Sequence, residues 1–200
     1  MDEQSWDARY EERESIWSGR PNGALTVEAA ELEPGQALDV GCGEGGDAVW
    51  LAERGWQVTA VDISKVALDR AAARSYDNAI AWKHGDLTQS APPPTSFDLV
   101  SAQYFPLPRA NPEAARGLID AVAPGGTLLY VGHDLSTMDE HHHRDWDGPD
   151  PRDYFTPAEI AELLDEAWEI EVNEQRPRVD TPESSGHFAE DLVLRARRLR

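Results

Sequence analysis

The chain has 200 residues, of which 40% are apolar and seven are tryptophan, so it can form one domain with a buried core. Its 18 basic and 38 acidic residues give a net charge of −20, which argues against nucleic acid or an anionic membrane as a partner. The sequence has no long apolar run and no signal peptide, so we expect a cytoplasmic protein without a membrane span. Its only cysteine is Cys42, which excludes an internal disulfide.

From residue 36 onward, short apolar runs alternate with helical patterns, which is typical of an α/β fold with a parallel sheet. The expected strands are 37–40, 56–61, 80–87, 97–103, 127–133, 168–175 and 188–198. The expected helices are 46–54, 64–74, 112–123 and 156–167.

Two regions lie outside this alternation. Residues 1–35 are expected to form an N-terminal cap segment, a helix and a loop across the carboxyl edge of the sheet, in front of a main domain over 36–200. The polar stretch 134–153 has no periodicity and is expected to be an active-site flap or a disordered loop.

The run from Gly41 to Gly46 fits the pattern GxGxxG between a strand and a helix, as in a dinucleotide-binding loop. However, Asp39, Glu44 and Asp47 place negative charge where a pyrophosphate would bind. At ~4 Å and an effective dielectric constant near 20, each carboxylate–phosphate pair costs about 4 kcal/mol. The loop therefore favours a cofactor that carries positive charge at this position.

The segment LDVGCGEG resembles the first motif of class I S-adenosylmethionine-dependent methyltransferases, and VTAVDIS, HGDL and VAPGGTLLYV resemble later motifs in the same order. This resemblance covers residues 36–133 closely. It implies a doubly wound, Rossmann-like sheet of seven strands in the order 3-2-1-4-5-7-6, with strand 7 antiparallel and an N-terminal helical cap. It also implies S-adenosylmethionine as the cofactor.

By the same resemblance, Asp62 holds both ribose hydroxyls, and a carboxylate suits this role because it only accepts hydrogen bonds. Ile63 packs on the adenine face, Asp86 accepts from the adenine amino group, and the backbone of Leu87 reads the ring edge. Gln103 lies where the family places groups close to the reactive methyl.

The N-terminal segments WDARY and IWSGRPN are similar to small-molecule methyltransferases of the tellurite-resistance and thiopurine type. The similarity implies that Trp17 and Arg20 contact the methionine end of the cofactor, where the guanidinium would bind a carboxylate. The predicted cofactor-binding residues are Trp17, Arg20, Asp39, Gly41, Cys42, Gly43, Asp47, Asp62, Ile63, Asp86, Leu87 and Gln103.

Tyr104 and His133 follow strands whose carboxyl ends should face the open cleft, so they are the candidate catalytic residues. His133 could serve as a general base. The adjacent histidines 141–143 cannot easily converge on one ion, and no metal site is predicted.

The predicted reaction is an in-line transfer of a methyl group to a small-molecule acceptor through a sulfur, oxygen or chalcogen nucleophile, with most of the catalysis coming from orientation. Two alternatives stay open: an NAD(P)-dependent oxidoreductase, and a regulatory module that binds S-adenosylmethionine without turnover. The acceptor also stays open, as does the choice between a monomer and a homodimer.

Overall fold

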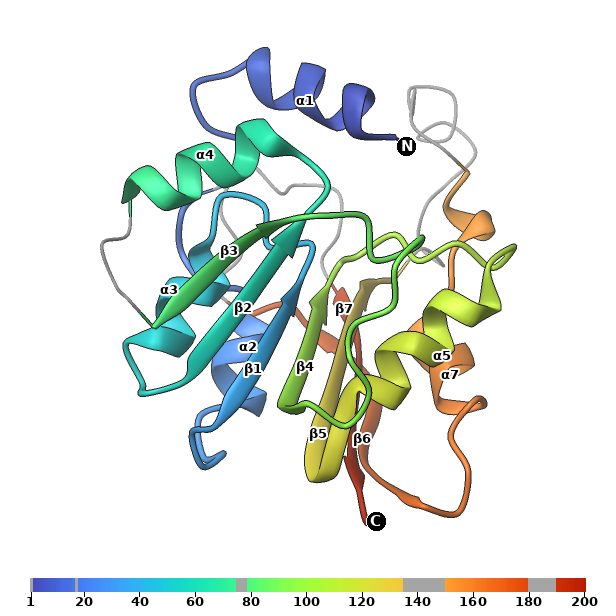
Figure 1. The fold of residues 1–200 in the computed structure, drawn as a ribbon. Helices are drawn as coiled ribbons and strands as arrows, with labels where there is room; N and C mark the ends of the chain where they lie inside the picture. Colours follow the sequence, from blue (N-terminus) through green and yellow to red (C-terminus); the bar gives the residue numbers. More distant parts are fainter. Residues whose placement is uncertain (1, 17, 75–78, 135–149, 180–189) are drawn as a thin grey trace.

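The computed structural model describes residues 2–16, 18–74, 79–134, 150–179 and 190–200, shown in Figure 1. Its helices are α1 (Glu3–Glu11), α2 (Gly23–Glu28), α3 (Gly46–Ala52), α4 (Lys65–Arg74), α5 (Pro112–Ala121), the 3₁₀ helix η1 (Pro151–Asp153) and α7 (Pro157–Ala161). Its strands are β1 (Gln36–Val40), β2 (Gln57–Asp62), β3 (Ile80–His84), β4 (Phe97–Gln103), β5 (Val122–His133), β6 (Trp168–Pro177) and β7 (Glu190–Arg198).

The strands form one seven-stranded sheet in the order β3-β2-β1-β4-β5-β7-β6. The pairs from β3 to β5 are parallel, whereas β7 is antiparallel to both of its neighbours. The predicted Rossmann-like fold and strand order are therefore confirmed. The winding direction reverses between β1 and β4, and the carboxyl edge at such a switch point is where open α/β sheets bind ligands.

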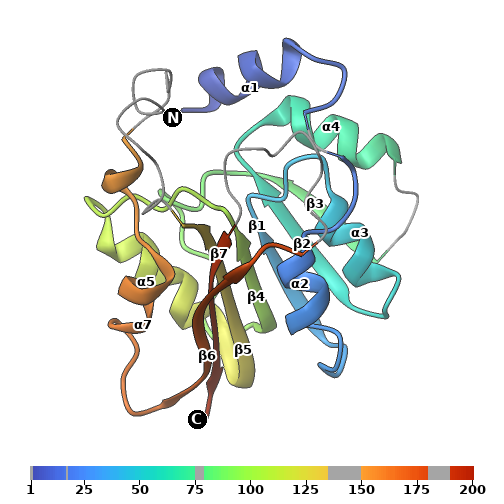
Figure 2. The same ribbon diagram turned by 180° about the vertical axis from the view of Figure 1, so that it is seen from behind.

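Helices cover both faces of the sheet (Figures 1 and 2). α2, α3 and α4 pack through Leu25, Leu51 and Leu68 on one face, and α5 and α7 pack through Leu118 and Ile160 on the other. Because both faces are covered, the central strands are apolar along nearly their whole length, as expected for a parallel sheet. No helix in the described ranges is long and apolar enough to cross a membrane.

The end of α7 and the start of β5 differ most from the prediction. α7 begins with a capping box of Thr156 and Glu159, at the start of the predicted helix, but it ends at Ala161 and not at 167, and the backbone N–H of Ala167 donates to Asp165 in a turn. Aspartate favours such local hydrogen bonds over a continued helix. β5 begins at Val122 and not at the predicted residue 127, and its pairing with β4 shifts in register between Phe97 and Leu99.

The N-terminal residues form two helices with different positions. α1 lies at the carboxyl edge of the sheet next to α4 (Figure 1), as expected for a cap. α2 instead packs on the sheet face near β5 and β7, where Ala24 and Leu25 are fully buried (Figure 2). Between the two helices, the N–H of Ile16 donates to Glu44 and that of Asn22 to Asp47, so these described residues lie at the carboxyl edge.

Candidate functional site

The loop after β1 is built by glycines in conformations that other residues rarely adopt. Gly41, Gly43 and Gly45 have φ angles of 68°, 52° and 84°, in the left-handed region. The N–H groups of Gly41 and Cys42 both donate to the carbonyl of Val61 in β2, at 2.9 and 3.0 Å. The loop is thereby fixed against the carboxyl end of β2.

Phe105 closes this loop from the side of β4, and sequence reasoning missed it. A Cβ atom built on Gly41 would lie 2.7 Å from Cδ2 of the Phe105 ring, so the ring packs directly on the glycine. The sequence contained a signal for this contact, because Phe105 follows the strand that neighbours β1.

Cys42 is buried inside the loop, and its Sγ lies 3.9 Å from the carbonyl of Gly43. Burial raises the pKa of the thiol well above its ordinary value, and the charges of Asp39 and Asp62 raise it further. The side chain stays protonated at neutral pH, which suits a small residue in a tight turn and not a nucleophile.

Three carboxyl groups are buried together around the loop: Asp39 at 2%, Asp47 at 6% and Asp62 at 8% exposure. Burial raises the pKa of Asp39 well above its ordinary value, and the charges of Asp47 and Asp62 add to the effect. Burial likewise raises the pKa of Asp47 and of Asp62, partly offset by the hydrogen bonds that each accepts. The charged form of each carboxyl group is therefore disfavoured unless a positive charge lies beside it.

Asp39 is the member of this group with unmet hydrogen-bonding capacity. Its Oδ2 atom is buried and has no hydrogen-bond partner among the described residues. Such an atom is costly unless a ligand supplies a donor. A cationic donor would satisfy the atom and the excess charge together.

Asp62 joins the glycine loop to the end of β2. Its Oδ2 accepts from the N–H of Gly43 and its Oδ1 from the N–H of Ser64, both at 2.8 Å. Each carboxylate oxygen has two lone pairs, so each can still accept one hydroxyl proton. The side chain is thus held in place and remains able to bind a diol.

Gln103 lies on the same sheet face as Asp39, because Asp39 pairs with Ser101 in the β1–β4 register and side chains alternate along a strand. Its Nε2 donates to the hydroxyl of Ser101 at 3.0 Å, while its buried Oε1 has no partner within the described ranges. Asp39 and Gln103 therefore bring two unsatisfied acceptors to adjacent strands at the switch point.

Tyr104 and His133, the two predicted catalytic residues, are in direct contact. Their rings are stacked with centroids 4.3 Å apart. Tyr104 has a φ angle of 56°, which is uncommon for a residue other than glycine and marks local strain. This conformation interrupts the alternation of β4 and places the Tyr104 ring with the core cluster of α2 and α3, where Gln103 also points.

Two residues from the end of the chain complete this contact, and sequence reasoning missed both. The hydroxyl of Tyr104 donates to Oδ1 of Asp191 at 2.8 Å, and the guanidinium of Arg178 lies 4.8 Å from the Tyr104 ring centroid. Nε of Arg178 also lies 3.2 Å from Oδ1 of Asp191. Only the antiparallel register of β5 and β7, which pairs His133 with Asp191, reveals this arrangement.

Burial and the positive charge of Arg178 lower the pKa of His133 to about 4, so its imidazole is neutral at physiological pH. Burial and the charge of Asp191 raise the pKa of Tyr104, so its phenol also stays protonated. Neither group ionises near neutral pH, and Asp191 already occupies the tyrosine hydroxyl.

The predicted adenine-binding residues follow β2 and β3. Asp86 accepts from the N–H and the hydroxyl of Thr88 through Oδ1, at 2.8 and 2.6 Å, which makes a compact turn after β3. Ile63 is half-buried, and Leu87 packs at the edge of the core. The parallel register places these residues at the same edge as Asp62.

The remaining predictions fall at or beyond the limits of the described chain. Arg20 is exposed, and its carbonyl oxygen lies against Gly46 at the start of α3. Trp17 and the histidines 141–143 lie outside the described residues. Within those residues, no group of three or more histidine, cysteine or acidic side chains could hold a metal ion.

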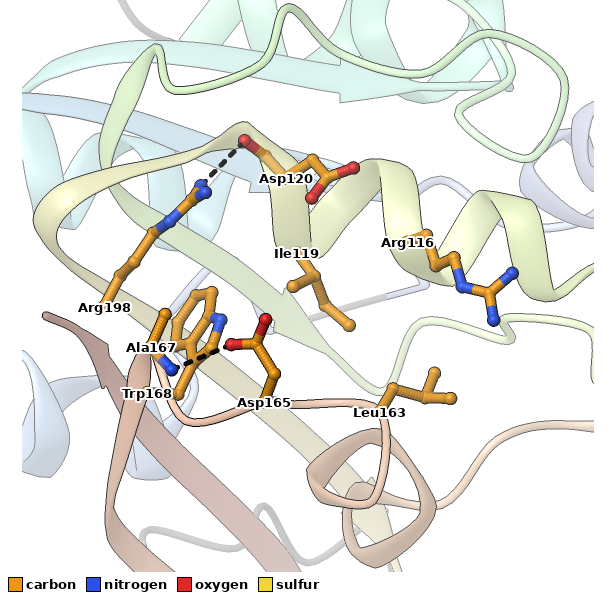
Figure 3. Close-up of a pocket in the computed structure, with 8 residues that line it drawn as sticks. All are labelled: Arg116, Ile119, Asp120, Leu163, Asp165, Ala167, Trp168 and Arg198. Atoms are coloured by element: carbon orange, nitrogen blue, oxygen red, sulfur yellow. Dashed lines mark hydrogen bonds between the residues drawn. The ribbon is translucent and has the colours of Figure 1, made fainter. Parts of the chain in front are cut away.

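A surface pocket lies elsewhere, between α5 and the start of β6 (Figure 3). Trp168, Arg198 and Asp120 contribute to its lining, and the guanidinium of Arg198 donates to the Asp120 carbonyl. These residues belong to the opposite, amino edge of the central strands. The pocket contains none of the predicted site residues.

Comparison with known proteins agrees with this geometry. A family described as a methyltransferase domain matches residues 37–126. An uncharacterized methyltransferase of Mycobacterium tuberculosis is 41% identical over 96 residues, which are 47% of this chain and 48% of that protein. Trans-aconitate 2-methyltransferase of Rhizobium meliloti is 29% identical over 156 residues, 77% of this chain and 59% of that enzyme. The chain thus spans about half the length of these curated relatives.

Among solved structures, the N-methyltransferase NodS of Bradyrhizobium japonicum in complex with S-adenosyl-L-homocysteine has a TM-score of 0.71. The two chains are 20% identical, and the match covers 99% of this chain and 98% of the other. At this identity the comparison shows a shared fold over the whole length of the chain.

Proposed function

We propose that the chain is a class I S-adenosylmethionine-dependent methyltransferase that acts on a small-molecule acceptor, because a methyltransferase-domain family matches residues 37–126 and an uncharacterized methyltransferase is 41% identical over 96 residues. When bound, S-adenosylmethionine would supply an electrophilic methyl group on a sulfonium that is a good leaving group. The residues of the chain would hold the cofactor, orient the acceptor and exclude water.

The observation that carries the proposal is the buried carboxylate oxygen of Asp39, which has no hydrogen-bond partner in the described part of the chain. Asp39 shares its surroundings with Asp47 and Asp62, whose charges act on it. A ligand with an α-ammonium group would neutralise this charge, whereas a dinucleotide pyrophosphate would add to it at a cost of about 4 kcal/mol per close pair. The same loop geometry therefore favours S-adenosylmethionine over NAD(P).

The other cofactor-binding residues are proposed in the roles that the resemblance implies. Asp62 would accept the ribose hydroxyls, with Ile63, Asp86 and Leu87 around the adenine. Gln103 would accept a hydrogen bond near the methyl group, because its unpartnered Oε1 lies on the same sheet face as Asp39. Arg20 and Trp17 would cover the methionine end.

Tyr104 and His133 are proposed to line the acceptor-binding site and to orient the acceptor. Moving a proton from a phenol with a pKa near 10 to an imidazole with a pKa of about 4 costs about 8 kcal/mol, so His133 is a weak base for oxygen acceptors. Orientation alone can supply ~7–11 kcal/mol. The site thus favours acceptors that are nucleophilic without a base, such as thiolates and chalcogen oxyanions.

Ligand-dependent thermal unfolding tests the proposed function. S-adenosyl-L-homocysteine at about 100 times its dissociation constant should stabilise the protein by about 2.7 kcal/mol and raise the Tm by roughly 5–10 °C, whereas NADH and NADPH should have no effect. Transfer of a labelled methyl group to a panel of thiols, phenols and chalcogen oxyanions then tests catalysis. Stabilisation by NADH alone would point to an oxidoreductase, and binding without transfer to any acceptor would point to a regulatory module.

Replacement of Tyr104 separates the role of its ring from that of its hydroxyl. Because the hydroxyl is bound to Asp191, Tyr104→Phe should keep kcat within about threefold, while Tyr104→Leu should lower it about 10–100-fold by removing the stack on His133. Steady-state kinetics with the best acceptor of the panel measure both variants. Equal losses in the two variants would instead assign the hydroxyl itself to the reaction.

A further inference from the structure

Glu44, within the glycine loop, is directed toward the N-terminal residues. Its side chain is only 1% exposed. Its Oε2 accepts from the Ser15 hydroxyl at 3.0 Å and from the Ile16 N–H at 3.2 Å. This acidic residue of the loop is therefore bound to the chain segment that crosses the carboxyl edge.

Arg70, from α4, connects Glu44 with the end of α1. Its Nη1 lies 3.1 Å from Oε1 of Glu44, while its Nη2 donates to the carbonyls of Tyr10 and Arg13 at 2.8 and 2.9 Å. One guanidinium thus holds the residues that follow α1 and neutralises the buried carboxylate of the loop. A fork of fixed donors makes arginine suited to this role.

The far end of the segment is attached to the same loop. Asp47 accepts from the backbone N–H of Asn22 at 2.7 Å and from its side-chain amide at 2.8 Å. Between these attachments, the carbonyl of Arg20 lies so close to Gly46 that a Cβ atom there would approach it to 2.6 Å. The segment is therefore fastened to the loop at both ends and packed against it between them.

A third attachment joins α1 to the residues beside Asp62. The hydroxyl of Ser64 donates to Oδ1 of Asp7 at 2.6 Å, and the N–H of Ser64 donates to Asp62. The group expected to hold the ribose is thus linked through Ser64 to the N-terminal helix. Each attachment ends on the elements that form the proposed cofactor site.

We propose that Glu44 and Arg70 are positioning residues that hold the described residues 12–16 and 18–22 against the cofactor-binding loop and thereby slow release of the cofactor. The inference rests on the proposed function. It assigns Glu44 to the N-terminal segment and not to direct contact with the cofactor. Breaking the pair should loosen the segment and increase the rate of cofactor dissociation, with little effect on association.

Two measurements on the full chain test this proposal. In Glu44→Gln, hydrogen–deuterium exchange over residues 12–22 should accelerate at least tenfold in the ligand-free protein. The dissociation rate of S-adenosyl-L-homocysteine, from stopped-flow displacement, should also rise at least tenfold, and KM for S-adenosylmethionine should rise while kcat changes less than twofold. Arg70→Lys keeps the charge, so exchange and dissociation should accelerate less in this variant than in Arg70→Gln.

Lys65→Gln provides the matched control, because Lys65 forms an exposed ion pair with Asp69 on the same helix. It should leave both measurements unchanged. The double variant Glu44→Gln/Arg70→Gln leaves no unpaired buried charge and serves if a single variant fails to fold. It should show the same faster exchange and dissociation.

The outcomes distinguish this inference from the proposed function. Faster exchange with unchanged dissociation would overturn the link to cofactor release, and unchanged exchange would overturn the positioning role. If the unmodified protein bound no S-adenosyl-L-homocysteine, the proposed function would fail and the link to cofactor release with it, while exchange would still decide whether Glu44 holds the segment.

Discussion

Asp39→Asn is expected to weaken binding of S-adenosyl-L-homocysteine by about 10–100-fold and at the same time to stabilise the ligand-free protein by about 1–2 kcal/mol at pH 7.5. The carboxylate of Asp39 is buried beside two acidic neighbours, and one of its oxygens has no hydrogen-bond partner within the ranges that the structure describes, so its charge is unfavourable until a cation binds. Isothermal titration and urea unfolding measure the two effects. Opposite signs for affinity and stability are the signature of a residue kept for binding.

The same residue should make stability depend on pH. The folded-state pKa of Asp39 is raised above the unfolded value near 4, so the folded state binds more protons and the free energy of unfolding falls as pH rises above about 4. The fall ends once pH exceeds the folded-state pKa. Asp39→Asn should flatten this part of the profile, and cofactor affinity in the unmodified protein should rise with pH over the same interval.

Glu53→Gln is the control for the loss of one negative charge, because Glu53 is exposed at the end of α3. It should change neither affinity nor stability by more than about 0.5 kcal/mol. Unchanged affinity in Asp39→Asn would show that the buried carboxylate does not bind the cofactor.

Gly41→Ala is expected to destabilise the protein by about 2–4 kcal/mol and to reduce cofactor affinity at least tenfold. The substitution forces alanine into the left-handed region at a φ of 68°, and it places a methyl group 2.7 Å from the Phe105 ring. Both effects displace the loop that holds Asp39 and Asp62. Urea unfolding and titration with S-adenosyl-L-homocysteine measure the result.

Gly125→Ala separates the cost of backbone strain from the cost of the contact with Phe105. Gly125 also has a positive φ, of 83°, but a Cβ atom added there would have no other atom within 4 Å, so the expected cost is about 1 kcal/mol from backbone strain alone. Adding Phe105→Leu to Gly41→Ala should recover part of the stability. A Gly41→Ala variant no less stable than Gly125→Ala would contradict the close packing of Phe105 on the loop.

The topology was predictable from the resemblance of the spaced motifs to a known family, and the positions of two candidate site residues were predictable from local patterns. Strand, loop and helix around Gly41 are adjacent in the chain, so local patterns suffice to place Asp39 and Asp62 at the carboxyl edge of the sheet. The rule for parallel strands also placed Tyr104 and His133 at this edge, where their rings are stacked, and their role toward an acceptor stays a prediction.

Partners that are distant in sequence were not predictable. The contact between Tyr104 and Asp191 joins residues 87 positions apart, and it requires the register of β7 as well as the unusual backbone of Tyr104. The N-terminal contact of Glu44 was equally hidden, because an acid at the start of a helix has an adequate local explanation in the helix dipole.

By itself, then, the sequence determined the alternation of strands and helices and the gathering of acidic residues around a glycine loop, since both follow from local patterns, and the order of the strands came from the resemblance of its motifs to a known family. Only the tertiary structure decided how these acids divide their roles. Glu44 and Asp47 hold the N-terminal segment, while Asp39 keeps an unpartnered oxygen among the described residues. The physical reason is that the function of a carboxylate depends on which hydrogen-bond donors surround it, and here those donors belong to N-terminal residues that are distant in sequence.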